Sequence, residues 1–403
     1  MSTRLLRSAA ENSSGSDKSS RSRPKILHVV SHLALGGAER VAVAVATSPG
    51  EIFDFAICAI RGIGDGPVGV SLRDEILAHR LPLHLGPRIP MRFGGVLTGA
   101  FTLARAIRAT QPDLVHLHTE IPEASCAALL AMRPHLRRLR LVRTIHNSVI
   151  WHFWPLLGRW CDRRLAHAFI AGVSPAALSA FGALRQNSGA PAPSHPPALI
   201  LNGLPAPCQW RPLDRSADTP LQIVFGGRFE REKGTDLIPA ILQHAPPPAG
   251  RHAHLHLFGS GAHEPLLRAL AQNPPPHWSV SLHAPMPDFA KNLHRYDALL
   301  LPSRHEGLAL VAIEAALAGL PVVATDAPGL REVFPRNYPL IARTGDPAHI
   351  GRTLSLALAR RDLAADAGQF AQAFARKNFD APTMIQHYCD LYSRVLETVP
   401  STL

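Results

Sequence analysis

The chain has 403 residues, enough for two domains of ordinary size or one with large insertions, and in either case long enough to bury a core. Hydrophobic residues make up 46% of the chain and charged residues 18%, which excludes a wholly disordered, collagen-like or mucin-like protein. Five widely spaced cysteines without a C-x-x-C pair exclude a disulfide framework and a structural zinc site. We therefore expect a cytoplasmic protein with reduced thiols.

The net charge of +12 favours anionic partners such as phosphates, nucleic acid or acidic lipid. The same bias toward Arg and Pro arises in proteins from GC-rich genomes, so the charge alone does not choose a partner. A nucleic-acid-binding protein would explain the charge, but the sequence shows no recognition helix, zinc finger or basic strand with interleaved aromatics. We expect no nucleic-acid partner.

No segment of the sequence predicts a transmembrane helix. The most apolar long window, 308–324, contains Glu314 and Pro321, which a membrane-spanning helix tolerates poorly. Residues 1–23 are rich in Ser and Arg and predict a disordered tail, not a signal peptide or an anchor.

From Lys25 onward, short apolar runs alternate with helical patterns. The sequence predicts strands over 26–30, 55–60, 114–117 and 140–145, and helices over 38–47, 71–78, 94–109 and 123–132. This alternation is typical of a parallel sheet with helices on both faces. In such a sheet, ligands bind at the carboxyl ends of the strands.

A Pro-rich stretch between residues 187 and 220 separates this half from a second one. There the sequence predicts strands over 222–225, 254–258, 279–283, 298–301 and 321–325, and helices over 235–243, 264–272, 289–293, 310–318, 347–361, 364–377 and 382–396. We therefore expect an α/β protein of two similar halves that meet across a cleft.

The loop after the first strand contains Gly36-Gly37-Ala38-Glu39-Arg40 and leads into a helix. Glycines at this place allow backbone N–H groups to approach an anion at the helix N-terminus, although a simple tight turn is an alternative. The loop is not G-x-G-x-x-G, so there is no dinucleotide fingerprint.

The second half opens in a similar way, with a strand followed by a Gly-rich loop that contains Arg228 and Lys233. Two cations at the carboxyl end of a first strand could clamp a diphosphate. Glu230 and Glu232 dilute the local positive field, and a solvated charged loop is the alternative.

The most informative segment is 301–325. Glu306 falls in a loop after a predicted strand, and Glu314 lies within an otherwise apolar helix. A carboxylate in such surroundings is costly unless it is hydrogen-bonded, and sugar hydroxyls are suitable donors. The helix N-terminus at Leu308 to Leu310 can receive phosphate. The alternative is a structural glutamate paired with an Arg or a backbone N–H.

Glu306 and Glu314 stand in the pattern P-S-x-x-E-G-x-x-L-V-x-x-E-A-x-x-x-G-x-P-V-V-A-T, which resembles the signature of family-4 retaining glycosyltransferases of the GT-B fold. Other segments resemble motifs of the same family: G-G-A-E at 36–39, T-I-H-N at 144–147, V-S at 173–174, N-G at 202–203, R-x4-K-G at 228–234, G-S-G at 259–261 and P-G-L-R-E-V at 328–333. The chain departs from the common pattern at Leu308-Ala309 and Pro328, which leaves open which backbone N–H groups contact phosphate. It also departs after the N-G motif, where Pro205 stands in place of the usual Asp.

The resemblance implies two Rossmann-like domains that face each other in the GT-B architecture. The expected organisation is a disordered tail (1–23), an acceptor domain (24–204), a Pro-rich linker (205–220), a nucleotide-sugar donor domain (221–379) and a C-terminal helix (380–403) that packs back on the first domain.

The resemblance also implies a retaining hexosyltransferase that uses a nucleotide sugar. The implied catalytic residues are His146, Arg228, Lys233 and Glu306. The implied donor-binding residues are Gly36, Gly37, Arg228, Lys233, Glu306, Gly307, Leu308, Ala309, Leu310 and Glu314. In this scheme Arg228 and Lys233 bind the diphosphate, Glu314 the ribose and Glu306 the transferred sugar, with His146 near the anomeric centre.

We expect no metal ion or other cofactor, because the sequence contains no D-x-D to hold a divalent ion on a diphosphate. His116 and His118 form an H-x-H on one face of a predicted strand. Without a third ligand nearby in the sequence, core or cleft packing is favoured over metal binding.

The family implies a glycan or lipid-linked acceptor, and a role in bacterial envelope or exopolysaccharide assembly. The alternative enzyme is another GT-B sugar-nucleotide enzyme, such as an epimerase. Basic and aromatic side chains on both sides of the 144–147 segment predict a peripheral surface for the inner face of the cytoplasmic membrane, with core aromatics and solvated arginines as the alternative. They are Arg133, Arg137, Arg138, Arg140, Arg143, Trp151, Phe153, Trp154, Leu156, Leu157, Arg159 and Trp160.

Overall fold

The computed structural model describes residues 23–34, 36–48, 52–207, 209–211 and 219–398. The tail predicted over 1–23 lies outside these residues except for Arg23, and the linker predicted over 205–220 lies partly outside them. Among the described residues, no helix has the length and apolar character needed to cross a membrane.

The first half is a seven-stranded parallel sheet with the strand order β3-β2-β1-β4-β5-β6-β7. Its strands are β1 (Lys25–Val30), β2 (Asp54–Ala59), β3 (Leu83–Leu85), β4 (Leu114–His118), β5 (Arg140–Ile145), β6 (Phe169–Gly172) and β7 (Ala198–Leu199). Its helices are α1 (Gly37–Ala46), α2 (Pro67–Ala78), α3 (Gly95–Thr110), α4 (Glu120–Met132), α5 (Pro155–Arg164) and α6 (Pro175–Ser188), with 3-10 turns η1 (Met91–Phe93) and η2 (Pro134–Arg138).

The second half is a six-stranded parallel sheet with the order β10-β9-β8-β11-β12-β13. Its strands are β8 (Leu221–Gly226), β9 (Ala253–Phe258), β10 (Trp278–His283), β11 (Ala298–Leu301), β12 (Val322–Thr325) and β13 (Ile341–Ala342). Its helices are α7 (Ile238–Gln243), α8 (Glu264–Gln272), α9 (Leu310–Ala318), α10 (Pro347–Ala359) and α11 (Arg361–Asn378), with 3-10 turns η3 (Arg231–Lys233), η4 (Thr235–Leu237), η5 (Phe289–Arg295) and η6 (Arg331–Val333).

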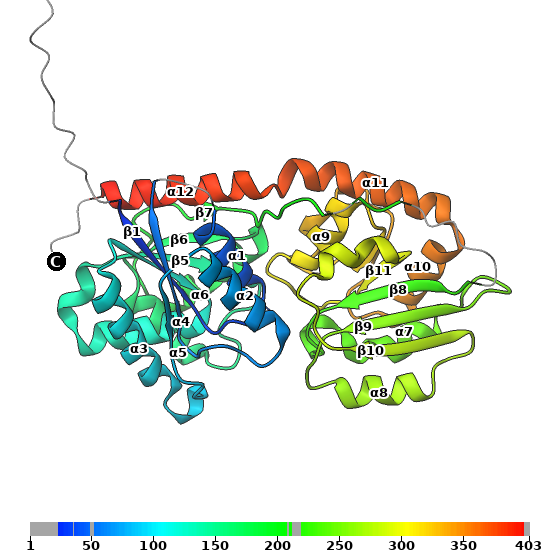
Figure 1. Ribbon diagram of the computed structural model, residues 1–403, viewed down its shortest axis with the longest axis horizontal. Helices are drawn as coiled ribbons and strands as arrows, with labels where there is room; N and C mark the ends of the chain where they lie inside the picture. The colour runs from blue at the N-terminus through cyan, green and yellow to red at the C-terminus, as the bar shows by residue number, and fades with distance from the viewer. Residues whose placement is uncertain (1–22, 35, 49–51, 208, 212–218, 399–403) are drawn as a thin grey trace, which may run out of the picture.

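The burial of the central strands explains why the sequence contains short apolar segments. Strands β11 and β12 are buried along their whole length, as expected where helices cover both faces of a parallel sheet. The predicted fold class, two Rossmann-like α/β sheets facing each other, is confirmed (Figure 1).

The last helix, α12 (Ala381–Glu397), returns from the second half to the first. Helices α11 and α12 follow one another along one side of both halves (Figure 1). Tyr388, Leu391, Tyr392 and Val395 of α12 are buried in a cluster with Ile26 and Val41 of the first half, among others. The apolar stripe of this amphipathic helix therefore completes the core of the first half.

Several elements differ from the sequence-based expectation. Segment 289–293 is part of the 3-10 turn η5, and predicted helix 235–243 divides into the turn η4 and the short helix α7. Helix α6 was not predicted, although its start carries a clear signal. Ser174 caps it by accepting a 3.1 Å hydrogen bond from the N–H of Ala177, and Pro175 follows the cap.

Candidate active site

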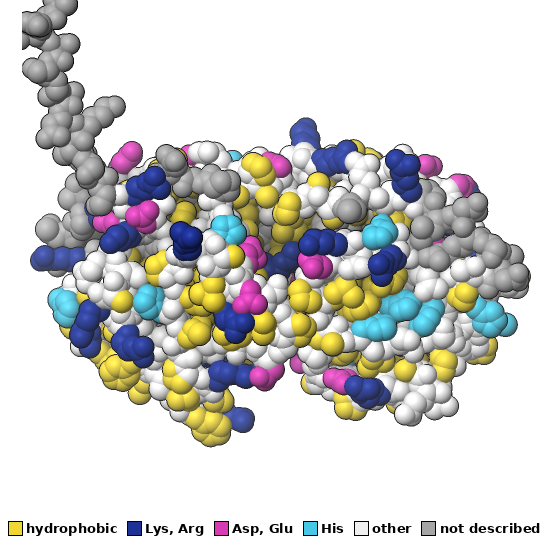
Figure 2. All heavy atoms as spheres, in the orientation of Figure 1, with side chains coloured by type: hydrophobic (Ala, Val, Ile, Leu, Met, Phe, Trp, Pro, Cys, Tyr) yellow, Lys and Arg dark blue, Asp and Glu magenta, His cyan; other side chains and the backbone are white. Residues whose placement is uncertain are grey.

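A cavity of about 350 Å³ lies between the two halves and is lined from both. The first half contributes the start of α1 and the loops after β4 and β5, and the second contributes the loops after β8 and β11 and the start of α9. Basic and acidic side chains gather where the halves meet (Figure 2). The cavity therefore lies at the carboxyl ends of parallel strands, where α/β sheets bind ligands.

Ten of the predicted site residues line this cavity: Gly36, Gly37, His146, Arg228, Lys233, Glu306, Gly307, Leu308, Ala309 and Leu310. Two helices of different halves begin here. A Cβ atom placed on Gly37 at the start of α1 would lie 3.3 Å from Leu310 Cδ1 at the start of α9. Two helix N-termini, whose first N–H groups have no acceptor within their own helix, therefore face one space, an arrangement that suits an anion.

Three cations at the cavity are each paired with a carboxylate. Lys233 Nζ lies 2.6 Å from Glu306 Oε2, and Arg40 lies 2.6 Å from Glu314 Oε1. Arg228 pairs with Glu232 and is half exposed. Arg228 and Lys233, the two of these cations that belong to the second half, both follow β8.

Glu306 is held at both carboxylate oxygens, since Ser303 Oγ donates to Oε1 over 2.8 Å. The next residue, Gly307, contacts the first half. A Cβ atom on Gly307 would lie 1.8 Å from the carbonyl oxygen of His146, and Ser174 Oγ donates to the Gly307 carbonyl over 2.5 Å. Glycine is required here by the close approach of the two halves.

Glu314 does not line the cavity itself. It lies one helical turn beyond Leu310, and its partner Arg40 reaches the cavity. Its second oxygen, Oε2, is buried and makes no hydrogen bond to any described residue. An unpaired buried carboxylate oxygen is costly, so a donor supplied by a ligand would be stabilising.

His146 follows β5, and its Nε2 lies 2.9 Å from Nδ1 of the buried His118. Burial lowers the pKa of His146 to about 3, so the imidazole is neutral near pH 7. The structure therefore places an uncharged histidine opposite the cations of the second half.

Glu39, in the first turn of α1, was not predicted as a site residue. It is 6% exposed and lines the cavity, and burial raises its pKa to about 7. Its Oε2 lies 2.1 Å from where a Cβ atom on Gly36 would be, so the glycine provides the space for this carboxyl. Sequence reasoning also missed Arg40, although both residues belong to the Gly-rich segment that it singled out.

His116 and His118 are fully buried, and the structure adds His28 as a neighbour that the sequence analysis missed. The candidate ligand atoms of these three histidines lie within 4.8 Å of one another, and no other group of metal-ligating side chains of this kind occurs in the described residues. Each histidine is already hydrogen-bonded to Tyr, Thr or another His.

Two family models match the chain, one for each half. The model described as Glycosyltransferase Family 4 matches residues 29–177, and the model described as Glycosyl transferases group 1 matches residues 209–374. The chain belongs to the family 4 glycosyltransferases of the GT-B fold.

Individual relatives of this glycosyltransferase are distant. It is 26% identical to a GDP-mannose-dependent alpha-mannosyltransferase of Mycobacterium tuberculosis over 344 residues, which is 80% of each chain. It superposes on Anabaena HepE, solved with UDP-glucose, with a TM-score of 0.72 at 18% identity, covering 92% of this chain and 99% of that one. The sucrose-phosphate synthase of Thermosynechococcus elongatus gives a TM-score of 0.70 at 16% identity, covering 93% and 99%.

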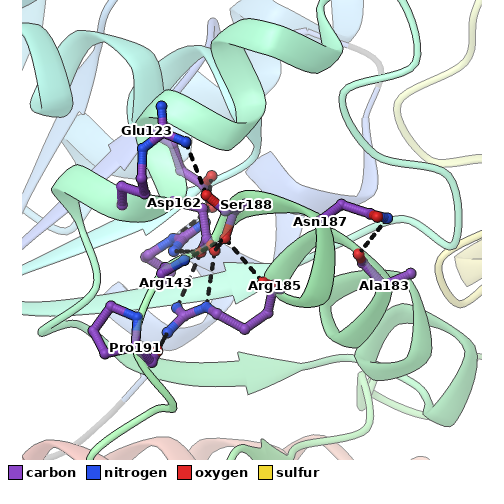
Figure 3. Close-up of polar contacts among 10 residues, drawn as sticks. Glu123, Arg143, Asp162, Ala183, Arg185, Asn187, Ser188 and Pro191 are labelled. Atoms are coloured by element: carbon purple, nitrogen blue, oxygen red, sulfur yellow. Dashed lines mark hydrogen bonds and ion pairs between the residues drawn. The ribbon is translucent and has the colours of Figure 1, made fainter.

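The predicted membrane surface of the glycosyltransferase needs correction. Arg143 is fully buried between Glu123 and Asp162, at 2.9 Å from each, and Arg185 and Ser188 complete this network (Figure 3). Its charge is balanced inside the protein and cannot meet a lipid headgroup.

Trp151 is also buried, packed on Gly158 of α5. Arg137 and Arg138 precede β5, whereas Phe153 follows it, and a six-residue strand of about 20 Å separates the two groups. The aromatic side chains that remain exposed, Phe153 at 85% and Trp154 at 48%, form a separate patch with Leu156 at 72%.

Proposed function

We propose that this glycosyltransferase moves a hexosyl group from a nucleoside diphosphate sugar to a glycan or lipid-linked acceptor, with retention at the anomeric carbon. The observation that carries the proposal is the meeting of two helix N-termini, Arg228 and Lys233 at one cavity. A relative named for GDP-mannose and a structural neighbour solved with UDP-glucose both point to a nucleoside diphosphate sugar.

In the proposed reaction, the bond between the anomeric carbon and the diphosphate breaks, and negative charge develops on the leaving phosphate. Arg228 and Lys233 would stabilise that charge, because cations fixed in a partly enclosed site need little reorganisation during the reaction. Glu306 would accept hydrogen bonds from the sugar hydroxyls beside Lys233, and His146 would approach the sugar from the other half.

We assign the ribose to Glu314. Its unpaired Oε2 is the acceptor that the ribose hydroxyls would satisfy, and Arg40 holds the other oxygen in place. The missing D-x-D and the two cations after β8 lead us to propose that transfer needs no metal ion, so activity should be the same in EDTA and in Mg²⁺. A strict Mg²⁺ requirement would contradict this assignment.

The proposal is tested with the full chain, by calorimetric binding of UDP and GDP followed by the matching nucleotide sugars. Glu314→Ala should weaken nucleoside diphosphate binding by about 10- to 100-fold, because it removes a charge-assisted hydrogen bond of roughly 1.5–3 kcal/mol. Glu264→Ala is the matched control, since Glu264 belongs to the same half and pairs with Arg268 at the surface. Equal affinities for the two variants would refute the ribose assignment.

The reaction type is tested by the product. Retaining transfer gives a new glycoside with the anomeric configuration of the donor, which NMR of the product shows directly. Conversion of the nucleotide sugar into its epimer without an acceptor would instead establish the alternative enzyme class.

The exposed aromatic patch favours a lipid-linked acceptor. Ile150 and Trp151 line the cavity, and Phe153, Trp154 and Leu156 follow them on the surface, so this patch adjoins the acceptor side of the site. We propose that it inserts into the membrane interface. Phe153→Ser combined with Leu156→Ser should reduce binding to anionic vesicles and leave UDP binding unchanged. Arg137→Glu combined with Arg138→Glu should reduce only that part of vesicle binding that added salt weakens. If Phe153→Ser with Leu156→Ser leaves vesicle binding unchanged, the patch does not insert into the membrane interface.

A further inference from the structure

Seven side chains form one hydrogen-bonded chain from the core of the first half to the cavity. In order, they are Tyr388, Thr144, His116, Tyr392, His28, His118 and His146. The successive distances are 3.4, 2.7, 2.8, 3.4, 2.9 and 2.9 Å. The first six residues are fully buried. Thr144 and His146 both line the cavity, and of the seven only His146 is partly exposed.

Each group in this chain has one hydrogen to donate. Burial lowers the pKa of His28 and His146 to about 3 and holds the pKa values of His116 and His118 well below the usual range. The histidines are therefore neutral, with one N–H each, and the three hydroxyls carry one O–H each. Seven hydrogens are thus available for six hydrogen bonds, and one is left over.

The surplus hydrogen lies either at one end of the chain or on a hydroxyl that accepts from both of its neighbours. Thr144 and Tyr392 carry such hydroxyls, but both side chains are fully buried and neither hydroxyl hydrogen-bonds to a described residue outside the chain, so a hydrogen pointing away from the chain would lack an acceptor. The surplus hydrogen therefore belongs at one of the two ends. At the core end, the Tyr388 hydroxyl contacts Thr144 and no other polar group of the described residues, so a hydrogen pointing away from Thr144 would be buried without an acceptor. At the cavity end, His146 Nδ1 makes no hydrogen bond to a described residue, and water or a ligand can accept from it.

We propose that the chain of hydrogen bonds runs from Tyr388 to His146, so that His118 donates to His146 Nε2 and holds His146 as a neutral donor whose Nδ1–H points into the cavity. His118 is then a positioning residue, with His28 behind it. His146 Nε2 is occupied as an acceptor, so His146 provides a hydrogen bond to an oxygen of the bound sugar or phosphate and does not act as a general base. This consequence rests on the proposed function, whereas the tautomer itself does not.

The test is the tautomer of His146 in the full chain without nucleotide, read from the two ring nitrogens by NMR of protein labelled with ¹⁵N-histidine. His146→Gln assigns the signals. We expect Nδ1 protonated and Nε2 unprotonated in the unmodified protein. His118→Leu removes the donor to Nε2 and should move His146 toward the Nε2–H form. His116→Leu is the matched control, because His116 is equally buried on the same strand but does not contact His146, and it should leave the tautomer unchanged.

An Nε2–H form in the unmodified protein would overturn the proposal even if no variant folds. An unchanged tautomer in a folded His118→Leu protein would also overturn it. So would a stoichiometric metal ion in the purified protein that disappears with His28→Leu, because a metal would take the lone pairs that the chain of hydrogen bonds uses. With a nucleotide sugar and an acceptor, His118→Leu should lower kcat about tenfold or more, the scale of weakening one preorganised donor, and His116→Leu should lower it much less.

Discussion

The buried carboxyl of Glu39 should make both the stability of the protein and its binding of the donor depend on pH. Its pKa rises from 4.5 to about 7 in the folded chain because burial disfavours the charged form. A hydrogen bond from the Glu39 backbone N–H and, less strongly, the nearby guanidinium of Arg228 lower this pKa, but they offset the effect of burial only in part. Between these two values the unfolded chain loses the proton and the folded chain keeps it, so the free energy of unfolding falls as the pH rises from about 4.5 to 7 and levels off above.

Glu39→Gln removes this dependence. A shift from 4.5 to about 7 corresponds to roughly 3 kcal/mol at about 1.36 kcal/mol per unit. The stability of the variant relative to the unmodified protein should therefore increase by up to that amount between pH 4.5 and 8. Urea unfolding of both proteins across this range measures it, and the other titrating groups cancel in the difference. A difference that stays constant with pH would refute the reasoning.

The same carboxyl should couple donor binding to proton uptake. A diphosphate at the start of α1 would be repelled by an ionised Glu39, and the diphosphate of a nucleotide sugar does not itself titrate between pH 6 and 8.5. Donor affinity should therefore fall with rising pH above about 7, by at most about tenfold per pH unit, which is the limit for one linked proton. Glu39→Gln should abolish this slope, and equal slopes in the two proteins would exclude Glu39 as its origin.

Two further predictions concern the cations and the contact between the halves. Arg228→Ala and Lys233→Ala should each remove about 2–4 kcal/mol of transition-state stabilisation. The loss appears as a lower kcat/KM for the donor, measured by initial rates in saturating acceptor. Gly307→Ala should lower transfer at least tenfold, because its methyl group would collide with the His146 carbonyl and separate the halves. Gly182→Ala is its control, because a Cβ atom on Gly182 in α6 would have no neighbour within 4 Å. Equal activities of the two glycine variants would contradict the close approach of Gly307 to the His146 carbonyl.

The strands that carry the site could be predicted because their sequences are short runs rich in apolar and β-branched residues. Strands β8 and β11 pair in one parallel sheet and end near Arg228 and Glu306, so pairing alone brings these two side chains to one edge. His146 follows β5 of the other sheet and meets them because the two halves face each other across the cavity. The short elements β3, β7 and β13 have two or three residues each, too few for a periodic pattern.

The electrostatics of the site could not be predicted, because they depend on contacts between elements far apart in the chain. Arg40 in the first half forms an ion pair with Glu314 in the second half. Tyr392 near the C-terminus hydrogen-bonds to His28 and His116. The same limit explains the errors at Arg143 and Trp151, whose burial depends on α4, α5 and α6 packing on the first sheet.

If Lys233 binds the phosphate and Glu306 the sugar, as proposed, their pairing would couple phosphate binding to sugar recognition. Arg228 is half exposed, so its ion pair with Glu232 contributes little and is easily exchanged for a phosphate. The Lys233 and Glu306 side chains are only 22% and 10% exposed. If a phosphate draws Lys233 away, Glu306 Oε2 loses its donor, and that loss is costly in an enclosed site.

On this proposal, a bound nucleoside diphosphate would leave Glu306 Oε2 without a donor, whereas the hydroxyl groups of a nucleotide sugar would replace Lys233 as the donors. The intact donor should therefore bind more tightly than its nucleoside diphosphate, and Glu306→Gln, which needs no countercharge, should reduce that preference by about tenfold or more. Calorimetric titration of both ligands into both proteins measures the preference. Glu232→Gln serves as the control, because Glu232 pairs with the exposed Arg228. If Glu306→Gln and Glu232→Gln keep the same preference as the unmodified protein, Lys233 and Glu306 act independently, and the sugar is recognised elsewhere in the cavity.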